Sequence, residues 1–320
     1  MWKHLKWLIL LIIIAIISVA IINRNWIYDW WRGINYKPSA EMAAIQDSLK
    51  LTDRGNFIFK ASHPTLDDSE TFNASCKSAH SGELAVLGCY TEDEIHVYNI
   101  QSEELKGIRE LTTAHELLHA NWKRMSKNDK HTLLNELNTI DINTNDKLTQ
   151  ELNNYSTDQQ SEELYVRAGT EIKDLPSNLE KHYGDIFQNQ DLIVSYYDSY
   201  ITVFLEIETE MNQLMSEMQS IQQEIDNTTI EYEQRASQLS AAVTSFNICA
   251  EQAGCFKSEY DFYSKRANLL NEQSALETIY NHINTLIDEY NIRVEKYNAD
   301  VTRTDKLNQA INSTKKTQGL

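Results

Sequence analysis

The most regular alternation of apolar and polar positions lies in the C-terminal part of the chain. Apolar residues recur there every seven positions, in series that lie three or four positions apart. This spacing places the side chains on one stripe of a helix, as in a coiled coil. The stripe comprises Phe204, Ile207, Met211, Leu214, Met218, Ile221, Ile225, Tyr232, Leu239 and Phe246, then Phe262, Leu269, Leu276, Ile283, Tyr290 and Tyr297, with Tyr280, Ile287, Val294 and Val301 interleaved.

The two helical runs are separated by the stretch NICAEQAGCFKSE, which contains Cys249, Gly254 and Cys255. Glycine commonly ends a helix, because it adopts left-handed backbone angles without strain. We therefore predict an antiparallel coiled-coil hairpin over residues 199–312, followed by a disordered tail at 313–320. Such a hairpin could recruit a protein partner along its outer surface.

Shorter patterns occupy the middle of the chain. Stretches rich in β-branched and aromatic residues predict strands, and periodicity near 3.6 residues predicts helices. The predicted strands are 56–62, 84–90 and 94–100, and the predicted helices are 39–51, 105–126, one from 127 onward, and 157–174. The last two strands are separated by TED, which indicates a hairpin. With only 9 Gly and 3 Pro in the chain, we expect an α+β fold that is mostly α.

The N-terminal segment is strongly apolar between Trp7 and Ile22, and an aromatic cluster follows it. A run of this length with interfacial aromatics predicts a transmembrane anchor over residues 1–32. A cleaved signal peptide is the alternative, because Ser18 and Ala20 form a small-residue cleavage pattern. Basic residues lie on both sides of the run, so they do not fix its orientation.

The four cysteines form two pairs that are local in sequence. We predict disulfides between Cys76 and Cys89 and between Cys249 and Cys255, although reduced, buried thiols remain an alternative. Disulfides favour an oxidising compartment. Together with the anchor, they predict a single-pass membrane protein whose C-terminal part is extracytoplasmic.

The overall charge limits the choice of partners. The chain has a formal net charge of −18 and a pI near 4.9. Proteins that bind nucleic acid present a basic face to the phosphates. We therefore expect no nucleic-acid partner, although an acidic balance by itself often means only a soluble surface.

The stretch TTAHELLHA carries the clearest chemistry in the sequence. His115 and His119 lie four residues apart, so both imidazoles project from the same side of a helix and could hold one Zn²⁺. Glu116 lies at the edge of that face, where its carboxylate could take a proton from a metal-activated water. The competing interpretation is a buried histidine pair without a metal. Uncharged flanking residues favour the metal site, because surface helices usually carry charges there.

This stretch resembles the active-site helix of the zincin metallopeptidases. Asn121 stands where that family usually has an apolar residue. The metzincin branch requires Gly and His where this chain has Trp122 and Met125, and thermolysin-like or aminopeptidase-like members would place a glutamate where it has Asn138 and Thr139. The resemblance therefore implies a gluzincin-type member with a more distant third ligand, in a small catalytic domain over residues 38–198.

The resemblance places the third zinc ligand on the predicted helix at 157–174. Glu163 is the first choice, followed by Glu162 and then Glu171. The stretch from Glu163 to Arg167 is similar to the family's E-x-x-A-D or E-x-x-A-N pattern, with arginine in the last place. Arginine cannot accept a hydrogen bond from a histidine, so the usual support of the ligand would be missing. Candidates for stabilising an oxyanion are Tyr165, Arg167, His131 and His182.

Two functions of different classes follow from these patterns. The first is a membrane-anchored, extracytoplasmic zinc metallopeptidase in which Glu116 acts as general base and the strand at 94–100 binds an extended peptide or protein substrate. The second is a membrane-anchored coiled-coil adaptor or scaffold whose zincin-like domain is inactive. A purely structural zinc site usually has four protein ligands. The sequence offers no clear fourth ligand, so catalysis is favoured. A wall-modifying amidase is a weaker third option.

Overall fold

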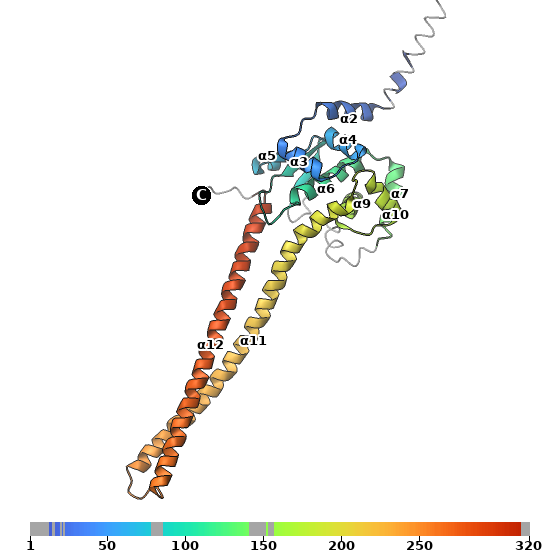
Figure 1. Ribbon diagram of the computed structural model, residues 1–320. Coiled ribbons are helices and arrows are strands. Elements are labelled where there is room, and N and C mark those ends of the chain that lie inside the picture. Colours follow the sequence, from blue (N-terminus) through green and yellow to red (C-terminus); the bar gives the residue numbers. More distant parts are fainter. Residues whose placement is uncertain are drawn as a thin grey trace, which may run out of the picture. The chain divides into compact units, whose positions relative to one another are not determined.

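A computed structural model describes residues 13–14, 17–19, 21, 23–77, 86–140, 152 and 157–314, with side chains described from residue 159 in the last range. The chain divides into two compact units (Figure 1). The first contains Met1–Phe204 and Lys306–Leu320, and the second contains Leu205–Asp305. The predicted tail at 313–320 lies outside the described residues from 315 onward.

The first unit contains many short helices and one small sheet. Its elements are α2 (Arg24–Asn35), α3 (Ala40–Ser48), α4 (Asp53–Ala61), β1 (Thr65–Asp67), α5 (Ser69–Ser75), β2 (Gly88–Thr91), β3 (Glu94–Tyr98), α6 (Ile108–Arg124), α7 (Lys127–Leu137), α9 (Thr157–Glu171) and α10 (Ser177–Gly184). Two long helices, α11 (Gln190–Ala250) and α12 (Glu259–Ile311), run through both units. The predicted fold class, α+β and mostly α, is confirmed, and so are the helices expected at 39–51, 105–126 and 157–174.

The strand predicted at 56–62 is wrong, because residues 56–61 belong to helix α4 and Ser62 is its C-cap. The Thr52 side chain accepts a hydrogen bond from the Gly55 backbone N–H and caps the helix, with Asp53 in its first turn. Ile58 and Phe59 then lie on the buried face. The aromatic residues suggested a strand, but the cap and the burial of one helical face outweigh that local preference.

The sheet has three strands in the order β1-β3-β2. β1 runs parallel to β3, and β2 runs antiparallel to it. Glu92 and Asp93 both have positive φ, 50° and 65°, which suits a two-residue hairpin turn between β2 and β3. The predicted hairpin is thus confirmed. β3 lies in the middle of the sheet, however, so the strand at 94–100 does not offer a free edge, and β2 is an edge strand instead.

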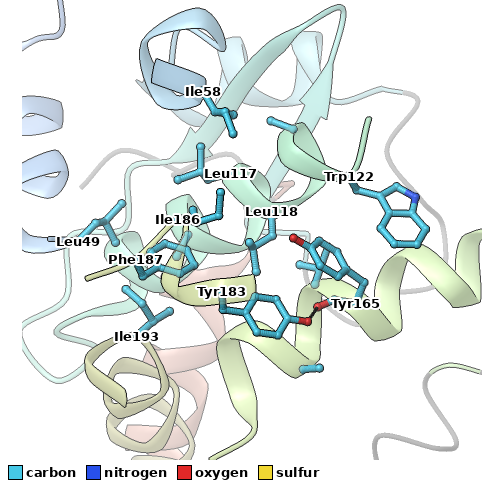
Figure 2. Packing of buried hydrophobic residues seen from close by; sticks show 14 of the residues in the cluster. Leu49, Ile58, Leu117, Leu118, Trp122, Tyr165, Tyr183, Ile186, Phe187 and Ile193 are labelled. Carbon is cyan, nitrogen blue, oxygen red and sulfur yellow. Dashed lines mark hydrogen bonds between the residues drawn. The ribbon is translucent and has the colours of Figure 1, made fainter. Parts of the chain in front are cut away.

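The core of the first unit is centred on α6. Leu117 and Leu118 are fully buried in one cluster with Tyr165 and Tyr183, and Figure 2 shows Leu118 beside the two tyrosine rings. The Tyr183 hydroxyl donates to the Tyr165 carbonyl oxygen over 2.6 Å, so that its polar end is also satisfied. Each buried leucine stabilises the fold by about 1.5–3 kcal/mol. This packing fixes α6 and α9 against each other, which matters for the site that they share.

Helix α2 is held against the rest of the first unit by two charged residues, Asp29 and Arg32. Asp29 accepts two hydrogen bonds of 2.9 Å from the Arg124 guanidinium at the end of α6. Arg32 donates to the Ala61 carbonyl oxygen over 2.7 Å. Trp30 and Trp31 lie on the opposite, exposed face of the helix. The predicted anchor boundary after residue 32 therefore falls inside an element that belongs to the first unit.

The membrane prediction is not retained. In the part of the chain that the structure describes, no helix combines the length and the apolar character needed to cross a bilayer. The apolar run from Trp7 to Ile22 lies mostly outside the described residues. This finding contradicts the predicted single-pass localisation.

The second unit is an antiparallel pair of helices formed by parts of α11 and α12 (Figure 1). Polar contacts join the two helices along their length: the ion pairs Arg235–Glu272 and Arg293–Glu217, both at 2.8 Å, and a 3.2 Å hydrogen bond between His282 and Glu224. Four residues of the predicted stripe are buried, Ile207, Leu214, Ile221 and Leu276, and so is Leu286, which lies outside it. Of the interleaved series, Val294 is half-buried, whereas Tyr280, Ile287 and Val301 are exposed. Leu286 is buried beside the exposed Ile287.

Both predicted disulfides are present in the structure. Cys249 pairs with Cys255 at the turn of the helical pair, and Cys76 pairs with Cys89. The second of these links α5 to strand β2, because Cys76 directly follows α5 and Cys89 lies within β2. One bridge thus closes a local turn, whereas the other fixes the edge strand of the sheet.

Candidate metal centre

Helix α6 carries the two histidines of the motif on one side. Its buried residues include Ala114, Leu117 and Leu118, which hold the helix against the core. The rings of His115 and His119 lie one turn apart, with their centroids separated by 5.1 Å. Both residues are only partly exposed. The spacing of the motif therefore leads to two imidazoles that share one side of a rigid helix.

Helix α9 brings Glu163 to these histidines. Its Oε1 lies 3.8 Å from His115 Nε2, and its Oε2 lies 3.6 Å from His119 Nε2. One ligand atom from each of the three residues falls within 4.8 Å of the others. Ligand atoms around a tetrahedral zinc are roughly 3.3 Å apart, given bonds of about 2.0–2.1 Å. The three residues could therefore hold a metal ion after small side-chain adjustments.

The electrostatics of this group suit a cation. Burial lowers the pKa of His115 to about 3, so its imidazole is neutral and able to bind metal at neutral pH. Burial alone would raise the pKa of Glu163, but the nearby histidines and Arg167 outweigh it and lower that pKa to about 2. Burial would lower the pKa of His119, but the hydrogen bond to Glu162 and the nearby carboxylates of Glu163 and Glu116 raise it well above its usual value. Two carboxylates thus attract positive charge to this point.

Glu162 holds His119 in position from the other side of the ring. The hydrogen bond between His119 Nδ1 and Glu162 Oε1 is 2.8 Å long. This contact directs Nε2 of the same ring toward Glu163. A carboxylate bound to the second nitrogen of a ligating histidine fixes the ring's orientation and strengthens it as a ligand. The two consecutive glutamates of α9 therefore have different roles in the geometry. Glu163 is one of the three candidate ligands, whereas Glu162 contacts the far nitrogen of one of them, His119.

Arg167 pairs with two acidic residues of its own helix. Its Nε lies 3.4 Å from Glu163 Oε1 and 3.0 Å from Glu171 Oε1. Glu171, the third choice from the sequence, thus faces Arg167. Arg167 also contacts the candidate ligand Glu163. The carboxylate that supports His119 comes from Glu162.

The other candidates for an oxyanion stabiliser lie apart from the histidines and Glu163. The Tyr165 hydroxyl accepts a 2.7 Å hydrogen bond from Asn121 and lies 3.0 Å from His182 Nε2. His131 is exposed on α7. Of the four candidates, Arg167 is the one in contact with a member of the group of three. The Asn121 contact also explains why this chain has a polar residue at an otherwise apolar position of the motif.

Glu116 projects from α6 toward strand β2. The residue is only 6% exposed, and its side chain lies next to Gly88 of that strand. It directly follows His115 in α6, and its negative charge contributes to the raised pKa of His119. The residue expected to act as base is therefore beside the candidate ligands and under the edge of the sheet.

Comparison with known proteins adds no assignment to this geometry. The chain matches no protein-family model, and no curated sequence or solved structure is significantly similar to it. The resemblance to the zincin metallopeptidases therefore depends on the motif and on the residues that surround it.

Proposed function

We propose that this protein is a zinc-dependent metallopeptidase that hydrolyses peptide bonds. The observation that carries the proposal is the convergence of His115, His119 and Glu163, with a carboxylate, Glu116, directly beside them. Two imidazoles and one carboxylate form the ligand set expected of a catalytic zinc site that leaves one position for water or substrate. Zinc bound there would polarise the scissile carbonyl and lower the pKa of its coordinated water.

The protein's own groups would divide the remaining work. His115, His119 and Glu163 would hold the ion, and Glu162 would keep the His119 ring in its ligating orientation. Glu116 would accept the proton of the attacking water at its carboxylate and pass it to the amine nitrogen of the leaving peptide. Its burial keeps bulk water away from this transfer, which strengthens the electrostatic interactions within the site.

We propose strand β2 as the place where a peptide substrate binds. Among the described strands, β2 pairs only with β3, so it has a second side on which an extended peptide could add as a further strand. Such addition gives affinity through backbone hydrogen bonds. Since Gly88 of β2 lies against Glu116, a peptide bound along this strand would pass close to the candidate base.

An inactive adaptor or scaffold is the alternative function. The antiparallel helical pair of the second unit supports it, because exposed residues such as Leu205, Met215 and Ile230 could contact a partner. Two observations favour the enzyme. A scaffold would have no use for an acidic side chain buried beside the ligands, and a structural zinc site would usually have four protein ligands, whereas three converge in the described part of the chain.

The test uses the full chain and four variants. Bound zinc is measured by atomic absorption, and cleavage of an unstructured protein such as casein is followed over time. We expect one zinc per chain and measurable cleavage. Glu116→Gln should retain zinc but lose at least about 100-fold in rate, as expected for loss of a general base. His115→Ala should lose both zinc and activity.

Matched variants test whether these effects are specific. Glu180→Gln and His131→Ala change exposed residues of α10 and α7, and both should behave as the wild type. If wild type and Glu116→Gln bind equal zinc and neither cleaves any unstructured substrate, the adaptor is the better assignment. Full zinc stoichiometry in His115→Ala would show that the ligands are assigned wrongly.

A further inference from the structure

Gly88 lies where any side chain would collide with the candidate base. A Cβ atom built on this residue would be 2.7 Å from Glu116 Oε1, 2.8 Å from Glu116 Cγ and 2.6 Å from Thr112 Cγ2. These separations are far below the van der Waals contact distance of about 3.5–4.0 Å. The absence of a side chain at position 88 is therefore what allows strand β2 to lie so close to α6.

The backbone at Gly88 does not itself require glycine. Gly107 and Gly254 have φ of 88° and 84°, in the left-handed region where glycine is favoured. Gly88 is not among the described residues with positive φ, and it pairs regularly with Val97 in the ladder between β2 and β3. Another residue could adopt this conformation in an isolated strand. The need for glycine thus comes from the neighbouring side chains.

Strand β2 and the Thr112 side chain are both held in place where they meet at Gly88. Strand β2 is held by its ladder to β3 and by the disulfide of the next residue, Cys89, with Cys76. The Thr112 hydroxyl donates to the Ile108 carbonyl oxygen over 2.8 Å, which holds its methyl group toward the strand. Threonine also has few side-chain rotamers in a helix. Glu116 has more rotatable side-chain bonds than Thr112, so its carboxylate and the contacts that it makes are what would shift if position 88 carried a methyl group.

We propose that Gly88 is a positioning residue that reserves the space in which the Glu116 carboxylate works. The proposal rests on the proposed peptidase function and adds a residue to its machinery. A side chain at position 88 would push the carboxylate away from its present place by several tenths of an ångström. Misplacement of a reacting group by about 1 Å can reduce a rate by about 100-fold.

The experiment compares Gly88→Ala with Gly184→Ala in the full chain. A Cβ at Gly184 would meet nothing within 4 Å, so this control should match the wild type. Gly88→Ala should retain one zinc per chain and lose about 10- to 100-fold in kcat, with KM changed by less than about threefold, because the ligands stay and only the base moves.

A second readout does not depend on turnover. Co²⁺ replaces zinc in each protein, and its visible absorption is recorded as a function of pH. Because Glu116 would bond to the water on the metal, Gly88→Ala should shift the pH at which the spectrum changes, and Gly184→Ala should leave it in place. A purely structural effect of the methyl group on the sheet would lower the melting temperature without moving this transition.

The double variant Gly88→Ala with Thr112→Ser covers the case in which Gly88→Ala does not fold. Serine keeps the hydroxyl but removes the methyl group at 2.6 Å, so only the collision with Glu116 remains. The double variant should fold, bind zinc and still show the loss in kcat. Wild-type kcat and an unchanged cobalt transition in either folded variant would overturn the role of Gly88 alone, whereas absence of zinc and cleavage in the wild type would overturn the proposed function as well.

Discussion

The two units of this protein are ordered in different ways. In Leu205–Asp305, contacts between α11 and α12 repeat along the helices, and the apolar stripe recurs at a fixed interval. In the first unit the decisive contacts occur once each and join distant parts of the chain, as in the pairs Asp29–Arg124 and His119–Glu162. A repeated interface can lose one contact and keep the rest. A site made from single contacts cannot, so sensitivity to mutation should concentrate in the first unit.

The largest expected effect is that of Leu118→Ala. Leu118 is fully buried on α6, and a leucine truncated in such a core costs about 2–5 kcal/mol. The matched change is Leu214→Ala in the helical pair, where the remaining stripe limits the loss to the lower end of that range. All 6 tryptophans precede residue 123, so their fluorescence in a urea titration measures the loss in the first unit, and far-ultraviolet circular dichroism, to which the long helices contribute strongly, measures the loss in the helical pair. Equal losses in the two variants would contradict the proposed difference.

Asp29→Ala should have a comparable or slightly smaller effect. It removes the carboxylate partner of the Arg124 side chain, which is only 16% exposed in the structure. Removing one member of such a buried ion pair costs about 3 kcal/mol. The counterpart is Glu272→Ala, which removes one of the two carboxylates that pair with the more exposed Arg235 of the helical pair. Far-ultraviolet circular dichroism and tryptophan fluorescence, recorded together, should show a lower urea midpoint only for Asp29→Ala. The comparison breaks down if Glu272→Ala is the more harmful change.

Glu162→Gln should weaken zinc binding without abolishing it. The glutamine retains a hydrogen bond to His119 Nδ1 but lacks the negative charge, and loss of such support typically reduces metal affinity by about 10- to 100-fold. Glu163→Gln, which removes a candidate ligand, should cause a greater loss. Competition with a chelator gives both affinities. If Glu162→Gln proved the more damaging of the two, the roles of these neighbours would have to be exchanged.

The smallest expected effect is a pH dependence of zinc affinity. The pKa of His119 is raised well above 6.5, whereas that of His115 is lowered to about 3. Only His119 therefore has to lose a proton when metal binds near neutral pH, and affinity should rise about tenfold per pH unit until its pKa is passed. Titration calorimetry in buffers of different ionisation enthalpy should detect close to one released proton per zinc. A count of zero or two would contradict the assigned protonation states.

The features predicted correctly from the sequence are those set by neighbouring residues. The disulfides join cysteines that are local in sequence, and His115 and His119 share a side of α6 because of helical geometry alone. The stripe of the helical pair follows the same logic, except that the prediction chose Ile287, which is exposed, over its buried neighbour Leu286. Periodicity cannot decide which of two such neighbours faces the partner helix.

The features that escaped prediction depend on what a segment packs against. The stretch containing Phe57 and Phe59 resembles a strand until the cap at Thr52 and the surrounding core are known. Strand order is set by pairing between distant segments, so the edge was assigned to the wrong strand. Gly88 gave no signal in the sequence, because its importance comes entirely from Glu116. Of the residues around the histidines, Glu163 was identified only through family resemblance, and the support from Glu162 required the structure.

The attachment of α2 bears on how a shortened form of the protein should be made. A sequence-based choice would start the fragment after the aromatic cluster, at about residue 38. Such a fragment would strip Asp29 from Arg124, whose guanidinium also donates to the Tyr90 hydroxyl on β2, the same strand that contains Gly88. Truncation there would disturb strand β2 through the contact at Tyr90. A lack of activity in that fragment would then result from the missing helix and would not count against the proposed peptidase function. A fragment intended for assay should therefore begin ahead of Arg24.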